Sequence, residues 1–340
     1  SMLATALCMV GIAILPTYAQ WGVIAPSLFI ILRLIQGMAF GVYVPLAWIY
    51  IAEQVPRQYL SVACSYVTAS FFVGVLFSNA FFVWLNSSMT PVQLLDYGWR
   101  VPFAVAALLS FLPLLAWRFI NESPFFIEMQ TRKPLRGVRQ PLTLLFKYCK
   151  HSIFLGLLLS LMIASITTVV ALLLPSLNEL SFSLDNDLFV FSHSLGIVFM
   201  IFGCVFYGIV SNHENFGKIL VFGSILLIGQ IFAFYYHLQA GGDYILIMYA
   251  LLGFFAGIVG MVPAIFVQLF PTNVRLTGLA LSYNVMYAIV GGLLPFALGY
   301  ATSYISFSPA LYIAFIGAMS IMVGLYFYHL PESRQLNRVI

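Results

Sequence analysis

The 340-residue sequence contains few charged residues. Asp, Glu, Lys and Arg make up 7% of the chain, whereas 62% of its residues are hydrophobic. Ordinary soluble domains contain roughly 25% charged residues, so this composition argues against a soluble protein. The net charge of only +4 also argues against a nucleic-acid-binding surface, which needs clustered basic side chains. The composition therefore predicts an integral membrane protein.

The sequence also has few residues able to support a disulfide framework or catalysis. Its four cysteines are far apart: Cys8, Cys64, Cys149 and Cys204. They indicate neither a disulfide framework nor metal-ligand spacing. An intramembrane enzyme would need an acid pair, a Ser/His arrangement or an HExxH metal site at membrane depth, but Arg33 and His193 are the strongly ionisable residues clearly inside apolar runs. We therefore expect no enzymatic activity, no cofactor and no metal.

Long apolar runs dominate the sequence instead. An α-helix needs about 20 mainly apolar residues to cross a bilayer. Ten runs approach or exceed this length, near residues 2–18, 24–50, 59–85, 101–120, 153–174, 188–210, 219–236, 244–269, 279–301 and 308–329. The pattern predicts an all-α, multi-pass membrane protein.

The basic residues predict its orientation. Half of the 14 Lys and Arg lie in one segment: Arg118, Arg132, Lys133, Arg136, Arg139, Lys147 and Lys150. Cytoplasmic loops carry an excess of such residues, so we expect this central segment to be cytoplasmic and in contact with anionic lipid. Alternation of the spans then places the C-terminus on the same side.

Two elements recur across the chain. SYVTASFFVG resembles SYNVMYAIVGG when Tyr66 is aligned with Tyr283, and a Glu-containing motif ends the fourth and the tenth runs at Glu122 and Glu332. Parallel repeats of this kind are typical of secondary transporters with two helix bundles. We expect an N-terminal bundle at 1-120, a cytoplasmic basic linker at 121-150 and a six-helix C-terminal bundle at 151-340.

The two repeats have unequal numbers of spans. The span at 219–236 corresponds to the first run of the chain, so the spans at 153–174 and 188–210 have no partners in the first half. The chain also begins with Ser1 rather than Met. We therefore expect two further helices to precede it, so that about ten of twelve transmembrane helices are present.

Five motifs run along the chain in a specific order: RLIQG (33–37), AEQVP (52–56), GWRVPF (98–103), NESP (121–124) and LFPTNVRLTG (269–278). Together they resemble the metabolite:proton symporters of the major facilitator superfamily, a group that includes proline/betaine, α-ketoglutarate and shikimate permeases. The resemblance implies two pseudo-symmetric helix bundles and alternating access. It further implies proton-driven uptake of a small carboxylate or zwitterionic osmolyte through a bacterial inner membrane. We expect a monomer.

Arg33 is the main candidate for a functional residue inside a span. A charged side chain at the bilayer centre costs at least about 2.5–3.5 kcal/mol, which predicts a wet or paired environment. A snorkelling arginine or a structural bond to a carbonyl is the alternative. Gln36 lies on the same helix face at i+3. The resemblance associates the arginine of RxxQG with proton coupling.

Other polar residues are candidates for a substrate or proton pathway. His193 suits a proton relay because its ordinary pKa is near neutrality, with a neutral structural histidine as the alternative. Tyr43, Tyr283 and Asn284 offer uncharged polar groups that can orient a substrate in an apolar cavity. Packing alone is the alternative for these three.

Charged residues also gather at the predicted cytoplasmic helix ends. Pairing between them would latch an inner gate in one conformation and release it in the other. Alternatively they are solvated charges worth about 0–1 kcal/mol per exposed pair. The set comprises Glu53, Arg57, Glu122, Arg275 and Glu332.

The segment QGMAFGVY (36–43) departs from the QGxxxGGE pattern of many family members. Val42 and Tyr43 stand where the pattern has glycine and an acid. Because this carboxylate is missing, an uncoupled facilitator is the alternative to a proton symporter. A non-transporting sensor or degenerate transporter is the third reading.

Glycine and proline positions predict local helix geometry. The spacings Gly37 to Gly41 and Gly253 to Gly257 allow close approach of helix backbones. Pro263 and Pro295 lie inside apolar runs and predict bends there.

Overall fold

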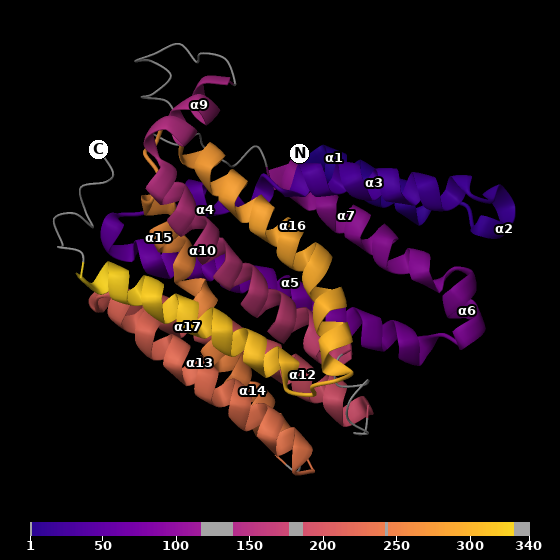
Figure 1. Cartoon of the computed structure of the whole chain (residues 1–340). Helices are drawn as coiled ribbons and strands as arrows, with labels where there is room; N and C mark the ends of the chain where they lie inside the picture. Colours follow the sequence, from indigo (N-terminus) through magenta and orange to yellow (C-terminus); the bar gives the residue numbers. More distant parts are fainter. Residues whose placement is uncertain (1, 117–138, 177–185, 242–243, 330–340) are drawn as a thin grey trace. The chain divides into compact units, whose positions relative to one another are not determined.

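The computed structural model describes residues 2–116, 139–176, 186–241 and 244–329 (Figure 1). All regular elements in these ranges are helices, which confirms the predicted all-α class. Contacts divide the chain into two compact units. Unit 1 comprises Ser1–Ala47 and Phe77–Lys133, and unit 2 comprises Trp48–Leu76 and Pro134–Ile340. The bounds of the two bundles and of the linker between them remain predictions from the sequence.

Unit 1 consists of α1 (Met2–Ala13), α2 (Tyr18–Trp21), α3 (Ile24–Phe40), the start of α4 (Tyr43–Gln54), the end of α5 (Leu60–Ser88), α6 (Pro91–Asp96), η2 (Gly98–Arg100) and α7 (Val101–Ala116). Helix α1 packs against α3 and α7. Arg100 of η2 ties the end of α6 to the segment after α1, because its guanidinium donates to the carbonyls of Asp96 and Leu15, each at 2.8 Å. This arginine therefore has a structural role.

Unit 2 contains the end of α4, the start of α5 and the remaining described elements. These remaining elements are η1 (Arg57–Tyr59), α9 (Arg139–Tyr148), α10 (Lys150–Ile166), the π-helical η4 (Thr167–Leu173), α12 (Asn186–His213), α13 (Phe216–Gln239), α14 (Ile245–Ala256), η5 (Gly257–Gly260), α15 (Val262–Gln268), α16 (Arg275–Thr302) and α17 (Ser308–His329). Helices α13 and α17 run side by side, α12 packs on α14, and α10 packs on α16 (Figure 1).

A glycine seam brings α12 and α14 together. A Cβ atom added to Gly253 would overlap the Gly196 carbonyl, and one added to Gly257 would overlap the backbone of Gly203. The close approach predicted at Gly253 and Gly257 is therefore confirmed. At Gly37, by contrast, a Cβ atom would meet nothing within 4 Å, so the described residues show no close approach there.

One of the two predicted bends appears as a break in the helix. The 3-10 turn η5 separates α14 from α15 directly before Pro263. Helix α16, which contains Pro295, runs without interruption from Arg275 to Thr302.

The apolar helices match the predicted spans. Within the described residues, eight helical stretches are long and apolar enough to cross a membrane: Ile24–Gln54, Arg57–Ser88, Lys150–Ser176, Leu188–His213, Phe216–Gln239, Ile245–Gln268, Arg275–Thr302 and Ser308–His329. Two shorter apolar helices, Met2–Ala13 and Gly98–Pro113, coincide with the first and fourth predicted runs. The chain is a multi-pass integral membrane protein.

Candidate functional site

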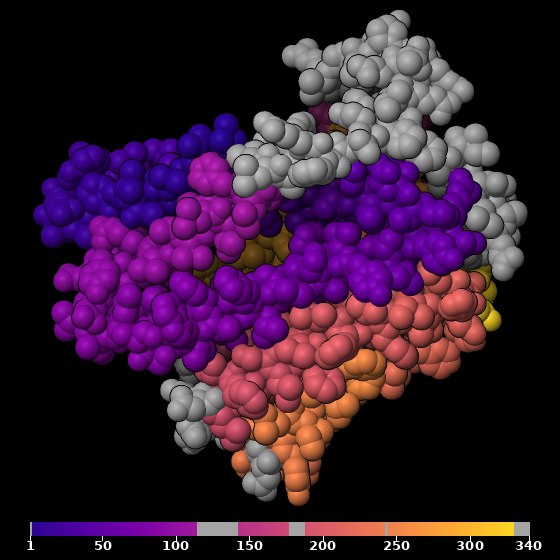
Figure 2. All heavy atoms as spheres, turned by 180° about the vertical axis from the view of Figure 1, so that it is seen from behind, coloured from indigo at the N-terminus to yellow at the C-terminus, as the bar shows by residue number. Residues whose placement is uncertain are grey.

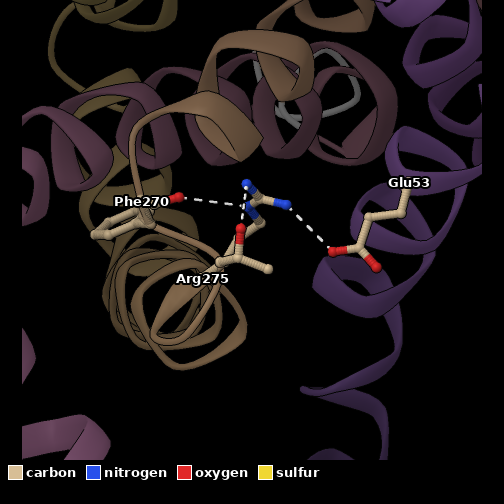
Figure 3. A network of polar contacts seen from close by, with 4 residues as sticks. Glu53, Phe270 and Arg275 are labelled. Carbon is tan, nitrogen blue, oxygen red and sulfur yellow. Dashed lines mark hydrogen bonds and ion pairs between the residues drawn. The ribbon is translucent and has the colours of Figure 1, made fainter. Parts of the chain in front are cut away.

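Arg275 and Glu53 form a buried ion pair in unit 2 (Figure 3). Arg275 Nη1 lies 3.2 Å from Glu53 Oε1, and the two side chains are 8% and 11% exposed. The guanidinium also donates from Nε to the Phe270 carbonyl and from Nη2 to Thr272 Oγ1, each at 3.3 Å. One cation therefore joins the end of α4 to the turn that precedes α16.

The local sequence explains why this cation needs three acceptors. Arg275 is the first residue of α16, where the helix dipole disfavours positive charge. The turn before it is closed by a hydrogen bond of 3.0 Å from the Val274 N–H to the Pro271 carbonyl. A Cβ atom at Gly278 would overlap the ring of Phe270, so glycine lets the turn fold back onto α16. The acceptors in the turn and the Glu53 carboxylate then offset the unfavourable effect of the helix dipole on the charge of Arg275.

The structure brings together part of the predicted gate. Arg57 is exposed and lies near enough to act electrostatically on Arg275, so Glu53, Arg57 and Arg275 form one cluster. Glu122 and Glu332 lie outside the described residues. The role of the cluster as a gate stays a prediction.

Helices α5 and α12 also meet in this part of unit 2. Ser61 and Ser211 share a hydrogen bond between their hydroxyl groups. A Cβ atom at Gly208 would overlap the side chain of Ser65. The purple α5 and the rose-coloured α12 lie against one another in Figure 2. Residues from the predicted first and second bundles therefore pack together here.

Three aromatic side chains, which we call the aromatic ladder, connect α4 to α16. The edge of Trp48 meets Tyr283 with ring centroids 5.5 Å apart, and Tyr283 packs on Tyr287 at 4.2 Å. At one end, Trp48 Nε1 donates to Thr68 Oγ1 at 3.2 Å. At the other, the hydroxyls of Tyr287 and Thr167 are 3.1 Å apart. The predicted residue Tyr283 is thus a buried member of a continuous contact chain.

Sequence reasoning missed Trp48 as part of this arrangement. Trp48 is 1% exposed, and a buried indole N–H needs an acceptor. A tryptophan inside an apolar run was the signal that could have identified it. Asn284, the neighbour of Tyr283, is half-buried and donates to the Ala280 carbonyl at 2.8 Å.

Arg33 lies in unit 1 on an exposed face of α3. Its Nη1 donates to Gln36 Oε1 at 3.1 Å, which confirms that the two side chains share a face. The guanidinium carbon lies 5.2 Å and 4.9 Å from the ring centroids of Phe29 and Phe103, within reach of a cation–π interaction. Within the described ranges, no carboxylate pairs with Arg33.

The two remaining pathway candidates lie in different units. Tyr43 in unit 1 is half-buried and stacks on Phe40 with centroids 6.3 Å apart. His193 in unit 2 is buried, and its ring edge meets Tyr249 at 5.8 Å. A common cavity formed by all six pathway candidates stays a prediction.

An apolar groove of about 370 Å³ lies between α12, α13 and α14. Glu214 and Lys218 line one part of it, with an ion pair of 2.8 Å. The pKa of the Glu214 carboxyl is below its ordinary value because Lys218 donates a hydrogen bond to it. None of the predicted site residues lines this groove. Among the described residues, no group of three or more His, Cys, Asp or Glu is placed to hold a metal.

The amino-acid sequence is similar to those of known membrane transport proteins. The inner membrane metabolite transport protein YhjE of Escherichia coli (strain K12) is 26% identical over 342 residues, covering 95% of this chain and 74% of that protein. The proline/betaine transporter of the same strain is 24% identical over 339 residues. That alignment covers 92% of this chain, which spans 65% of the transporter's length.

Comparison with solved structures supports the same fold. The proton:xylose symporter XylE bound to 6-bromo-6-deoxy-D-glucose superposes with a TM-score of 0.79 at 17% identity, covering 98% of this chain and 79% of that one. The transporter FucP in the outward conformation gives a TM-score of 0.69 at 15% identity, with 96% and 80% covered. The sequence profile of the Major Facilitator Superfamily matches residues 1–295. The chain therefore belongs to the Major Facilitator Superfamily.

Proposed function

We propose that this protein is a proton-coupled symporter for a small polar organic metabolite, either a carboxylate or a zwitterionic osmolyte. The observation that carries this proposal is the similarity along 92–95% of the chain to proteins named for metabolite and proline/betaine transport. The name of YhjE favours the bacterial inner membrane as the location, with the central basic segment and the C-terminus in the cytoplasm. We further propose that the protein acts as a monomer.

The Glu53–Arg275 pair is assigned to the inner gate. It joins α4, from the predicted first bundle, to α16, from the predicted second bundle. Alternating access requires such helices to separate and meet again. Separation loses the Coulomb attraction but returns both charges to water, and the two terms are of similar size for a buried pair. The pair is therefore suited to a contact that opens and closes.

Arg33 is assigned to recognition of the substrate or response to the proton. Its guanidinium is a planar fork of N–H donors, a shape that matches a carboxylate through two parallel hydrogen bonds. The exposed position on α3 leaves the fork accessible, while Gln36 holds one of its nitrogens. Phe29 and Phe103 provide apolar walls, which suits a small organic anion or zwitterion.

An uncoupled facilitator is the second candidate. Tyr43 stands where many related symporters have an acid, and it stacks on Phe40. A phenol does not exchange protons near neutral pH as a carboxylate does. This residue favours a facilitator if the lost carboxylate is essential for coupling.

Uptake into cells separates the two candidates. Cells expressing the full reading frame are supplied with labelled proline, glycine betaine or α-ketoglutarate, with and without a protonophore. The variants are Arg33→Ala, Arg33→Lys, which keeps the charge but loses the fork, and Lys147→Ala as a control cation on α9. A symporter predicts uptake that the protonophore abolishes and that Arg33→Ala removes, with Lys147→Ala unaffected. Protonophore-insensitive uptake would contradict coupling and support a facilitator.

A further inference from the structure

The apolar groove between α12, α13 and α14 carries its charged groups at one end. Glu214 and Lys218 line it beside the turn between α12 and α13, and the other lining residues are apolar or aromatic. Asn215 fixes this turn, because its side chain accepts a hydrogen bond of 2.9 Å from the Gly217 N–H and caps α13. The groove is therefore amphipathic along its length.

The apolar part of the groove is open to the outside of unit 2. Residues of α12 and α13 line its two sides, and the last turn of α14 lines the rest. Phe206 of α12 and Phe254 of α14 meet there with ring centroids 5.3 Å apart. Phe206 and Phe222 are 48% and 60% exposed. In a membrane protein, apolar side chains exposed in this way face lipid.

The depth of the groove matches one leaflet of a bilayer. Its lining residues on α13 run from Lys218, in the first turn of the helix, to Leu226. At 1.5 Å per residue this stretch covers about 12 Å along α13, close to half of the roughly 30 Å of hydrocarbon in a membrane. Helices α12, α13 and α14 each form part of a span long enough to cross a membrane. The groove therefore runs from the membrane surface toward the bilayer centre.

This shape fits a phospholipid better than the other occupants that a membrane offers. A small polar metabolite would leave its polar groups without partners against apolar walls. A partner helix would need an apolar contact along about 20 residues, whereas the groove follows only the first part of α13. An acyl chain of one leaflet has the required length, and it places its headgroup beside the charged pair.

The ion pair is complementary to a zwitterionic headgroup. Lys218 Nζ lies 2.8 Å from Glu214 Oε2, and the two side chains are 48% and 51% exposed, so both charges are accessible. A lysine ammonium has three donors, and a carboxylate has two acceptor oxygens. Lys218 can therefore donate to a lipid phosphate while Glu214 accepts from a primary ammonium. A headgroup without a cation would bring its phosphate close to the Glu214 carboxylate, which would repel it.

We propose that this groove binds one phospholipid whose headgroup carries a primary ammonium, as in phosphatidylethanolamine. One acyl chain lies between α12 and α13 against Phe254, the phosphate accepts from Lys218, and the ammonium donates to Glu214. The inference concerns a lipid on the outer surface of the transporter, and it depends neither on proton coupling nor on the transported metabolite.

Photo-cross-linking in lipid nanodiscs tests the proposal. The protein expressed from the full reading frame is placed in bilayers of equal parts dioleoyl phosphatidylethanolamine, phosphatidylglycerol and phosphatidylcholine. A trace of phosphatidylethanolamine carries a diazirine on one acyl chain, and peptide mapping locates the labelled residues. We expect labelling to concentrate on the groove residues of α12, α13 and α14. Equal labelling of all exposed helices would overturn the proposal, because it would show ordinary annular lipid.

Displacement of the probe by unlabelled lipid identifies the headgroup. Phosphatidylethanolamine should displace it about two- to fivefold more effectively than phosphatidylcholine, the range expected for a contact with a half-exposed charge, because the choline headgroup has no N–H donor. Glu214→Gln should remove this preference while labelling in the groove persists. Equal displacement by all three lipids, a preference for phosphatidylglycerol, or displacement by free oleate as effective as by phosphatidylethanolamine would each overturn the proposal.

Leu226→Trp and Ile225→Trp form a matched pair for the groove itself. Leu226 lines the groove and Ile225, its neighbour on α13, does not, although the two side chains are 48% and 49% exposed. Leu226→Trp should lower labelling in the groove several-fold, whereas Ile225→Trp should leave it unchanged. Equal labelling in the two variants would contradict binding in the groove.

The unsubstituted protein decides the matter if Leu226→Trp does not fold, because the displacement series needs no variant. A groove that takes no label, combined with cross-linking of two copies through α12 and α13, would also overturn the proposal. That result would mean that a second copy of the chain, rather than a lipid, covers the groove.

Discussion

Arg275 occupies a position at which a cation depends on its partners. It is buried at the first turn of α16, and its guanidinium is held by the Phe270 carbonyl, Thr272 and the Glu53 carboxylate. Removal of one member of a buried ion pair leaves the other charge without compensation, whereas removal of both is far less costly. The pair therefore fixes a conformation more than it adds net stability.

Glu53→Gln should raise the free energy of the paired conformation by about 3–5 kcal/mol, because Arg275 stays charged without its carboxylate. The readout is alkylation of a Ser61→Cys thiol in a background that lacks the native cysteines, since Ser61 is 5% exposed in the present arrangement. We expect faster alkylation in Glu53→Gln and restored protection in Glu53→Gln combined with Arg275→Met.

Glu214→Gln is the control for this prediction. Glu214 belongs to a pair with Lys218 in which both side chains are about half exposed, so its loss should leave the alkylation rate unchanged. If Glu53→Gln alone also leaves the rate unchanged, the pair does not hold this conformation.

At the scale of single helices, the seam between α12 and α14 depends on small residues. Each side presents backbone to the other at Gly196, Gly203, Gly253 and Gly257. Lipid tails offer as good an apolar environment as a neighbouring helix, so helix association in a membrane relies on close packing and hydrogen bonds. The seam is consequently sensitive to one added methyl group.

Gly253→Ala should destabilise the protein by about 1–3 kcal/mol, the usual range for overpacking. The added methyl would overlap the Gly196 carbonyl, which belongs to the backbone and cannot rotate away. Gly229→Ala on α13 is the matched control, because nothing lies within 4 Å of its Cβ position. The comparison is made by thermal unfolding in detergent. Equal unfolding temperatures for the two variants would mean that the seam is looser than described.

The helices were more predictable than the contacts between them. Apolar length located the eight helices of spanning length and the two shorter apolar helices among the described residues, because the bilayer demands about 20 apolar residues per span. The π-helical form of TTVVALL was not predicted, since hydropathy does not separate π from α geometry. Among the site residues, the pairing of Arg275 with Glu53 agrees with the grouping that the sequence suggested.

Arg33 shows which neighbours of a site residue could be predicted from the sequence and which could not. Its i+3 relation to Gln36 followed from helix geometry, whereas the flanking Phe103 comes from α7, 70 positions further along the sequence. Trp48 and Thr68 are likewise joined only by folding. Such pairs depend on helix packing, which one sequence does not specify.

At the scale of the whole molecule, the protein is a secondary transporter of the Major Facilitator Superfamily rather than an enzyme. Alternating access predicts that α5 and α12 must part at the Ser61–Ser211 contact. A Ser61→Cys/Ser211→Cys pair in a background without native cysteines should therefore stop uptake when oxidised and recover it when reduced. Uptake assays of oxidised and reduced cells provide the measurement.

A local cross-link controls for oxidation itself. Thr302 and Ser308 lie 2.9 Å apart through their hydroxyls in the turn between α16 and α17. A Thr302→Cys/Ser308→Cys bridge should leave uptake intact, because both residues border one turn. Continued uptake with the Ser61/Ser211 bridge closed would contradict separation of α5 and α12.

The most direct test of coupled symport is accumulation in proteoliposomes. Purified protein is reconstituted with the substrate found in cells, and an inward proton gradient is imposed with the membrane potential clamped at zero. Symport predicts that the substrate accumulates inside above its external concentration, and that the excess disappears when the gradient is collapsed. Substrate that only equilibrates to the external concentration while the gradient persists would contradict coupling and identify the protein as a facilitator.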